Sequence, residues 1–333
     1  MRVLPHLFFA LVFIIATIAL SGPAVRLSAQ TNSPAKGISS EETRQDLSEI
    51  RKAGFTYLRS GDWANASDTF AKALGMAPGD YLSLYGSAVA LFNLRRPVEA
   101  RINVDRAIDI LNRTKANDAL LADSFVLSAV IQAAQKNTEE AIAALLKAIK
   151  LMPDHFDANF TLGRAYFGNG DVNKAVKAFR RAVGIMPDNI DARFFLATAL
   201  ERVGDFEAAL QEYRAILLIN KNSDRGNLGL GVLLIKLEGN TSVEGLAALR
   251  KAVSLNGDLY EARITLGKSL LQSNNAEAAV GHLKKAAELA PDNPEPHYQL
   301  AMAFRQLGLK AEAAAEFRIV RRIHEERRSV PNN

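Results

Sequence analysis

Residues 156–189, FDANFTLGRAYFGNGDVNKAVKAFRRAVGIMPDN, contain a pattern that returns through the chain with a period of 34 residues. In this segment the recurring residues are Leu162, Gly163, Tyr166, Ala175, Phe179, Ala182 and Pro187. The same spacing is found in Gly54, Tyr57, Ala66, Phe70, Ala73 and Pro78, and in Leu266, Gly267, Leu270, Ala279, Leu283, Ala286 and Pro291. A fixed period of this length is typical of repeat architectures, in which successive units stack on one another.

The spacing resembles that of the tetratricopeptide repeat. The resemblance implies an all-α protein, a right-handed α-solenoid of stacked antiparallel helix pairs, in which proteins or peptides bind to a concave groove. Counted from residues 156–189, eight repeats cover 47–80, 81–114, 122–155, 156–189, 190–223, 224–259, 260–293 and 294–327. Because stacked repeats share one continuous core, we expect one elongated domain over residues 39–329.

Glycine and proline divide each repeat into two helices. Glycine falls at the expected turn after the first helix in four repeats, at Gly61, Gly170, Gly204 and Gly308. It tolerates the positive φ that such a turn needs. Proline ends the second helix in four repeats, at Pro78, Pro153, Pro187 and Pro291.

Two joints depart from the repeat length. Seven extra residues, 115–121, precede the third repeat, and two are added around residues 238–245. Each joint is interpreted either as a hinge or as a longer surface turn.

Composition and motifs argue against catalysis. The 333 residues include no cysteine, which excludes disulfides, thiolate metal sites and a cysteine nucleophile. The five histidines lie far apart, and no phosphate-binding loop or nucleophile elbow is found. The formal net charge of +5 gives only a weak field for nucleic acid. We therefore predict a protein that is not an enzyme and has no catalytic residues, metal site, cofactor or nucleic-acid partner.

The first 29 residues are typical of a secretory signal peptide. Arg2 supplies the positive start, residues 7–20 are free of charge, and small residues follow to Ala29. The apolar stretch is short for a membrane span, which needs about 20 residues. We expect an exported protein, periplasmic or extracellular, with a disordered linker at 30–38. An uncleaved leader that anchors the protein to the membrane is the alternative.

The resemblance also implies which side chains face the groove. The candidate partner-binding residues are Tyr85, Phe92, Phe160, Arg164, Phe167, Phe194, Lys268, Tyr298 and Arg305. The aromatic rings would supply apolar contacts, and the basic groups could hold carboxylates or carbonyl groups of a partner. The alternative is that the aromatic residues serve the packing of their own repeats.

Two further patterns concern acidic and terminal residues. An acid recurs at the second position of five repeats, as Asp123, Asp157, Asp191, Glu261 and Glu295. We interpret these acids as first-turn residues that favour the helix dipole, not as metal ligands. At the C-terminal end, Phe317, Val320 and Ile323 are expected to be partly exposed, which leaves open a homodimer through the last helix.

Taken with the leader, the repeats predict a non-catalytic scaffold or adaptor in the bacterial cell envelope. Its partner would be a protein or peptide bound in the groove. The alternative is an accessory or regulatory subunit of an envelope enzyme, or of a system that assembles polysaccharide or peptidoglycan.

Overall fold

The computed structural model describes residues 41–115, 117–240 and 242–329, and all regular secondary structure in these ranges is helical. The predicted leader, the linker and the expected start of order at Ser39 lie outside the described residues. None of the described helices is long and apolar enough to cross a membrane. The chain divides into two compact units between Pro187 and Asp188.

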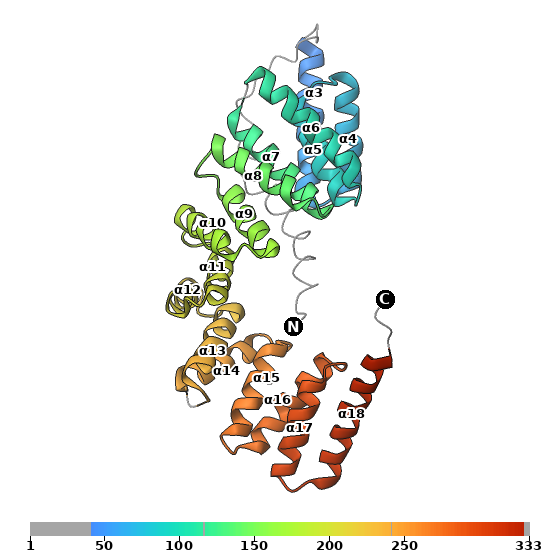
Figure 1. Ribbon diagram of the computed structural model, residues 1–333. Helices are drawn as coiled ribbons and strands as arrows, with labels where there is room; N and C mark the ends of the chain where they lie inside the picture. The colour runs from blue at the N-terminus through green and yellow to red at the C-terminus, as the bar shows by residue number, and fades with distance from the viewer. Residues whose placement is uncertain (1–40, 116, 241, 330–333) are drawn as a thin grey trace. The chain divides into compact units, whose positions relative to one another are not determined.

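The first unit holds four helix pairs, labelled as in Figure 1. They are α3 (Glu41–Ser60) with α4 (Trp63–Met76), α5 (Tyr81–Asn93) with α6 (Pro97–Thr114), α7 (Asp118–Ala134) with α8 (Thr138–Leu151), and α9 (Phe156–Asn169) with α10 (Val172–Ile185). Each second helix packs on its own first helix, and α4, α6 and α8 also pack on the first helix of the next pair.

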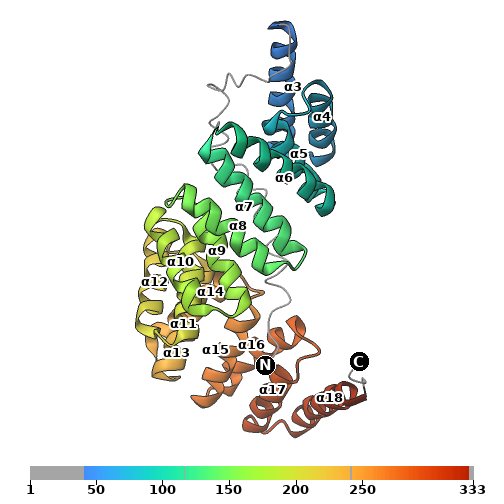
Figure 2. The ribbon, with the colours of Figure 1, turned by 45° about the horizontal axis from the view of Figure 1, so that its top comes forward.

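The second unit repeats the arrangement. Its pairs are α11 (Ile190–Val203) with α12 (Phe206–Ile219), α13 (Asp224–Glu238) with α14 (Val243–Leu255), α15 (Tyr260–Gln272) with α16 (Ala276–Leu289), and α17 (Pro294–Gln306) with α18 (Lys310–Ser329). The helices of each pair run side by side in both views (Figures 1 and 2). The prediction of an all-α solenoid built from about eight stacked helix pairs is confirmed.

The turns inside seven of the described pairs have a residue with positive φ at the same repeat position. Gly61, Gly170, Gly204 and Gly308 have φ between 73° and 89°, as predicted. Arg95, Lys136 and Asn274 occupy the same repeat position in three other pairs, with φ of 62°, 66° and 57°. In the remaining pair Gly239, one position later, also has a positive φ of 79°, but its ψ of −170° lies outside the left-handed helical region. The turn therefore needs a left-handed residue even where the sequence shows no glycine, at a cost of about 1–2 kcal/mol for a non-glycine residue.

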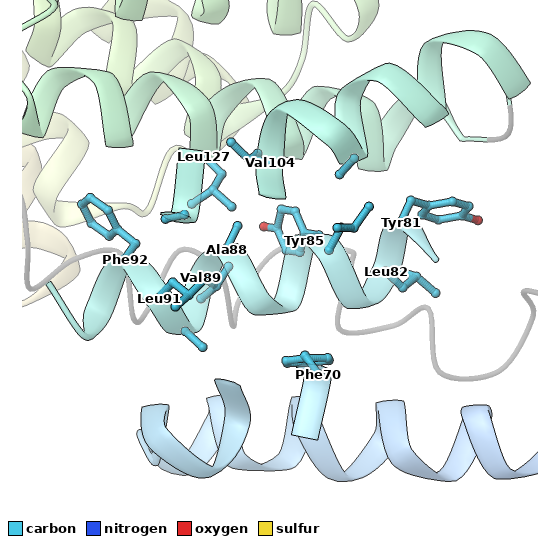
Figure 3. Packing of buried hydrophobic residues seen from close by; sticks show 14 of the residues in the cluster. Phe70, Tyr81, Leu82, Tyr85, Ala88, Val89, Leu91, Phe92, Val104 and Leu127 are labelled. Atoms are coloured by element: carbon cyan, nitrogen blue, oxygen red, sulfur yellow. The ribbon is translucent and has the colours of Figure 1, made fainter. Parts of the chain in front are cut away.

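The core of the first pairs is built around Phe70. This side chain is fully buried and lies edge-on to Phe55, with ring centres 5.1 Å apart. A Cβ atom added at Gly54 or Gly86 would come within 2.7 Å or 2.3 Å of the Phe70 ring. Phe70 points toward the helix that carries Tyr85 (Figure 3). The small residues of the repeat are thus needed because a ring occupies the space between helices.

The insertion before the third repeat lengthens two helices. Helix α6 continues to Thr114, and α7 begins at Asp118, where the Asn117 side chain accepts the backbone N–H of Leu120 at 3.0 Å. Leu120 and Leu121 belong to the same buried cluster as Leu111 of α6. The extra residues are therefore mostly helical and packed. Hinge motion at this joint, and at residues 238–245, stays a prediction.

Candidate functional site

The candidate residues of the first unit divide by burial. Tyr85, Phe92 and Phe160 are only 7%, 5% and 3% exposed. Arg164 and Phe167 are half-buried. The Phe160 ring contacts Phe156 and Phe179, with ring centres 5.6 Å and 5.9 Å away, and the Arg164 guanidinium lies 5.8 Å from its centre. Phe160 therefore serves the packing of its own repeat, which was the alternative to a groove residue.

The candidates of the second unit are more accessible. Phe194 is half-buried, with its ring centre 6.2 Å from that of Tyr213. Lys268 is half-buried and donates to Glu295 at 2.8 Å. Tyr298 is 47% exposed, and Arg305 is exposed. Of the nine candidates, Tyr298 and Arg305 are both exposed and both lie on α17.

The C-terminal helix differs from expectation at one residue. Phe317 and Val320 are half-buried, as expected, and the Phe317 ring lies edge-on to Tyr298 with centres 6.0 Å apart. Ile323 is 3% exposed, so its predicted partial exposure is wrong. Because Ile323 is buried, it adds no apolar area to a surface for a second copy.

Sequence reasoning missed a group of titratable residues in the first unit. We call Tyr85, Asp123, His155 and Asp157 the acidic cluster. They come from three successive pairs, because Tyr85 lies in α5, Asp123 in α7 and Asp157 in α9, which His155 precedes. His155 Nε2 lies 2.9 Å from Asp123 Oδ1, and the charges of Asp123 and Asp157 both act on the pKa of Tyr85.

The interpretation of Asp123 as a first-turn acid is wrong. Because the insertion starts α7 at Asp118, Asp123 lies beyond the first turn of that helix. It is 9% exposed, and its Oδ1 atom lies 2.9 Å from His155 Nε2. Its Oδ2 atom is buried and has no hydrogen-bond partner. By contrast, Asp157 does lie in the first turn of α9. The only sequence signal was the acid's recurrence, which did not reveal burial.

His155 holds two helices through its two ring nitrogens. Its Nδ1 atom accepts the backbone N–H of Ala158 at 3.3 Å and so caps α9. Because that N–H is a donor, Nδ1 carries no proton, and Nε2–H donates to Asp123. Burial lowers the pKa of His155, but the hydrogen bond and charge of Asp123 outweigh it and raise this pKa overall. Protonation of Nδ1 would break the cap on α9, whereas the raised pKa of His155 favours a protonated ring beside Asp123.

Asp157 has an unusual environment for an acid. Burial, together with the negative charge of Asp123, raises the pKa of Asp157 to about 6, although His155 acts in the opposite direction. Burial and the charges of Asp123 and Asp157 also raise the pKa of Tyr85. The cluster is therefore rich in acceptors and negative charge, held in surroundings that disfavour that charge.

Two acids with raised pKa values, Glu201 and Glu261, occur in the second unit. Tyr213 donates its hydroxyl to Glu201 at 2.6 Å, yet burial raises the pKa of Glu201 overall. Burial and the charge of Glu201 raise the pKa of Glu261. Among the described residues no group of three or more histidine, cysteine or acidic side chains could hold a metal ion.

Replacing His155 separates its two contacts. In His155→Asn the amide oxygen can still cap α9, but the short side chain leaves Asp123 without its partner. His155→Ala loses the cap as well. We therefore expect its unfolding free energy to be about 1 kcal/mol lower than that of His155→Asn. Urea unfolding followed by circular dichroism measures the difference. Equal stabilities for the two variants would show that the cap contributes nothing.

The family of the chain follows from comparison with known proteins. Models described as tetratricopeptide or TPR repeats match residues 52–119 and 126–190, residues 167–228, and residues 267–308. No curated protein matches the sequence. Together these matches span most of the helix pairs described above.

Solved structures agree at the level of fold. The C-terminal part of a TPR repeat-containing protein from Cytophaga hutchinsonii is 16% identical, with a TM-score of 0.60 over 75% of this chain and 99% of that chain. The pilF protein of Pseudomonas aeruginosa is 19% identical, with a TM-score of 0.56 over 67% and 97%. A tetratricopeptide repeat protein from Parabacteroides merdae is 17% identical, with a TM-score of 0.52 over 78% and 99%. The chain belongs to the tetratricopeptide repeat family.

Proposed function

We propose that this protein is a non-catalytic scaffold or adaptor that binds proteins or peptides in the bacterial cell envelope. Solenoids of this kind bind partners over extended surfaces formed by successive repeats. The envelope location rests on the features of residues 1–29, namely a basic start, an apolar core and small residues near Ala29.

The observation that supports binding most directly is the exposed face of α17. Tyr298 and Arg305 are seven residues apart and therefore lie on the same side of the helix, two turns from each other. Both are exposed, although Tyr298 also touches Phe317. Tyrosine and arginine are the residue types that most often dominate the energy of protein interfaces. Packing within the repeat therefore leaves Tyr298 and Arg305 accessible to a partner.

The test is crosslinking in intact cells, followed by purification from the envelope fraction and mass spectrometry. Tyr298→Ala with Arg305→Ala is expected to lose the polypeptides that crosslink to the wild type. The matched control is Val243→Ala with Lys251→Ala, an exposed apolar and basic pair on the second helix α14. The control should keep them. Circular dichroism verifies that both variants remain folded.

Two outcomes would overturn the proposal. One is recovery of the same polypeptides by wild type, double variant and control, which would place binding elsewhere. The other is recovery of nothing beyond the tag alone, which would remove the binding function. A crosslinked product with the mass of two copies would instead identify a homodimer.

A further inference from the structure

Two helix pairs of the second unit share a contact between a base and an acid at the same repeat position. Arg193 of α11 donates to Glu212 of α12, with 2.5 Å between Nη1 and Oε2. His297 of α17 lies 2.7 Å from Glu316 of α18, measured between Nδ1 and Oε2. In both pairs the acid follows the base by 19 residues. A base on the first helix is therefore compensated by a glutamate on the second.

The pair of α15 and α16 has the base but not the acid. The base is Arg263, and the residue 19 positions later is His282, whose Nδ1 atom lies 3.5 Å from Arg263 Nη1. Both side chains are half-buried. Within the described ranges, neither forms an ion pair with an acid. The position that holds glutamate in two other pairs thus holds a second basic residue here.

The contact between Arg263 and His282 leaves hydrogen-bond donors unused. Arginine only donates, so His282 Nδ1 accepts and the neutral ring carries its proton on Nε2. No residue in the described part of the chain accepts from that Nε2–H group. Arg263 also donates from Nε to the carbonyl of Gly257 at 2.9 Å, so it uses two of its five N–H groups. Both side chains can therefore donate to an acceptor from outside the pair.

The surroundings of His282 are positively charged. Burial lowers the pKa of His282, and the charges of Arg263 and Arg250 lower it further. Arg250 is exposed on α14, which packs on α15. Lys285, three residues along α16, is already paired with Asp258 at 3.3 Å. An anionic group at this place would relieve the repulsion among the bases.

We propose that Arg263 and His282 bind a carboxylate of the polypeptide partner, supplied by a glutamate or aspartate side chain. The carboxylate would compensate Arg263 as Glu212 compensates Arg193, through charge-assisted hydrogen bonds from the guanidinium. The inference rests on the proposed function, because it names the chemistry of the partner at a second place in the unit that contains α17.

Carboxylate binding was predicted from the sequence at other bases. Lys268 is already paired with Glu295 at 2.8 Å, and Arg164 lies beside Phe160. Arg263 was not among the candidates. What distinguishes it is the absence of a glutamate 19 residues later, which becomes meaningful only when the contacts of the other pairs are known.

Replacing His282 by glutamate supplies the missing acid from within the chain. We expect His282→Glu to melt at a higher temperature than wild type at pH 7, because Arg263 gains the kind of partner that Arg193 has. The same variant should bind an external carboxylate at least about tenfold more weakly, the loss typical of a charged hydrogen bond. A lower melting temperature would contradict the inference, because it would show that this place requires the imidazole itself.

The probe is N-acetyl-glutamate α-amide at millimolar concentration and constant ionic strength, with N-acetyl-glutamine amide as the neutral counterpart. Binding to the full chain is followed by NMR shifts of the His282 ring protons and the Arg263 Nε–H group. Arg263→Gln should bind the probe at least about tenfold more weakly than wild type. The matched control is Lys284→Gln, which removes an exposed basic charge from the same helix as His282 and should bind like wild type.

The reciprocal change tests the comparison between the pairs. Glu212→His removes the acid of the pair of α11 and α12 and leaves Arg193 beside a second basic residue. We expect this variant to melt at a lower temperature and to show a probe-dependent shift at Arg193 that wild type lacks. Circular dichroism verifies that it is folded. A folded variant without the new shift would contradict the role given to this repeat position.

Two further outcomes overturn the inference. One is equal shifts with the neutral probe, and the other is tighter binding of inorganic phosphate than of the carboxylate probe. Failure of the proposed function remains distinguishable from failure of this site. If crosslinking recovers partners but Arg263→Gln binds the probe like wild type, only the carboxylate site fails. If the probe binds as expected but crosslinking recovers no partner, only the proposed function fails.

Discussion

Phe70→Ala is expected to reduce the unfolding free energy of the first helix pairs by about 3–5 kcal/mol, the usual loss for deleting a buried aromatic ring. The ring is fully buried and in contact with Phe55, and it stands where any side chain at Gly54 or Gly86 would collide with it. Two helices, α3 and α5, would therefore lose their common support at once. Because each repeat contacts only its neighbours, the effect should remain local.

Hydrogen exchange read by mass spectrometry tests this expectation. Amides of α3, α4 and α5 should exchange faster in Phe70→Ala, while those of α15 to α18 in the other unit should be unchanged. Phe167→Ala provides the matched control, since it removes the same ring from a half-buried position. Equal losses of stability in the two variants would contradict the role given to Phe70.

Asp80→Ala is expected to have the second-largest effect, a loss of about 3 kcal/mol or more, as found when one partner of a buried ion pair is removed. Asp80 is 5% exposed and caps α5, because its Oδ2 atom accepts the backbone N–H of Ser83 at 3.0 Å and the Ser83 hydroxyl at 2.6 Å. Its Oδ1 atom accepts from Arg51 Nη1 at 3.1 Å. One substitution thus uncaps a helix and leaves a mostly buried guanidinium alone.

Asp80→Asn is the control that separates these contributions. An asparagine retains the cap but removes the charge, so we expect it to recover about 1 kcal/mol of the loss, the usual value of a cap. Guanidinium chloride is unsuitable as the denaturant, because its ions screen the pair. Urea unfolding at low salt measures all three proteins. Equal stabilities of Asp80→Ala and Asp80→Asn would contradict the capping role of Asp80.

The recurring residues of the 34-residue pattern predicted the fold because each of them has a steric role. Phe70 fills the gap that Gly54 and Gly86 leave, and proline ends helices at fixed distances. The left-handed turn was predictable only where glycine marks it. Arg95, Lys136 and Asn274 adopt the same conformation without any local signal, since the packing of the two helices imposes it. Tertiary structure here overrides residue preference.

The candidate site was less predictable because exposure depends on neighbouring repeats. Tyr85 and Phe160 occupy positions that the family resemblance assigns to the groove, yet both are buried. Asp123 was misinterpreted because the pattern could not show that the inserted residues extend α7 backward by a turn. The burial of Asp123 depends on side chains from neighbouring repeats. The sequence of a single repeat does not contain that information.

The acidic cluster exists only when three consecutive helix pairs are assembled. A fragment that ends after α6 would contain Tyr85, and one that begins at α9 would contain Asp157, but neither would contain the arrangement. His155 also joins the start of α9 to α7, so its contact forms only after the two pairs have docked. A fragment that separates α7 from α9 therefore loses the contact between His155 and Asp123.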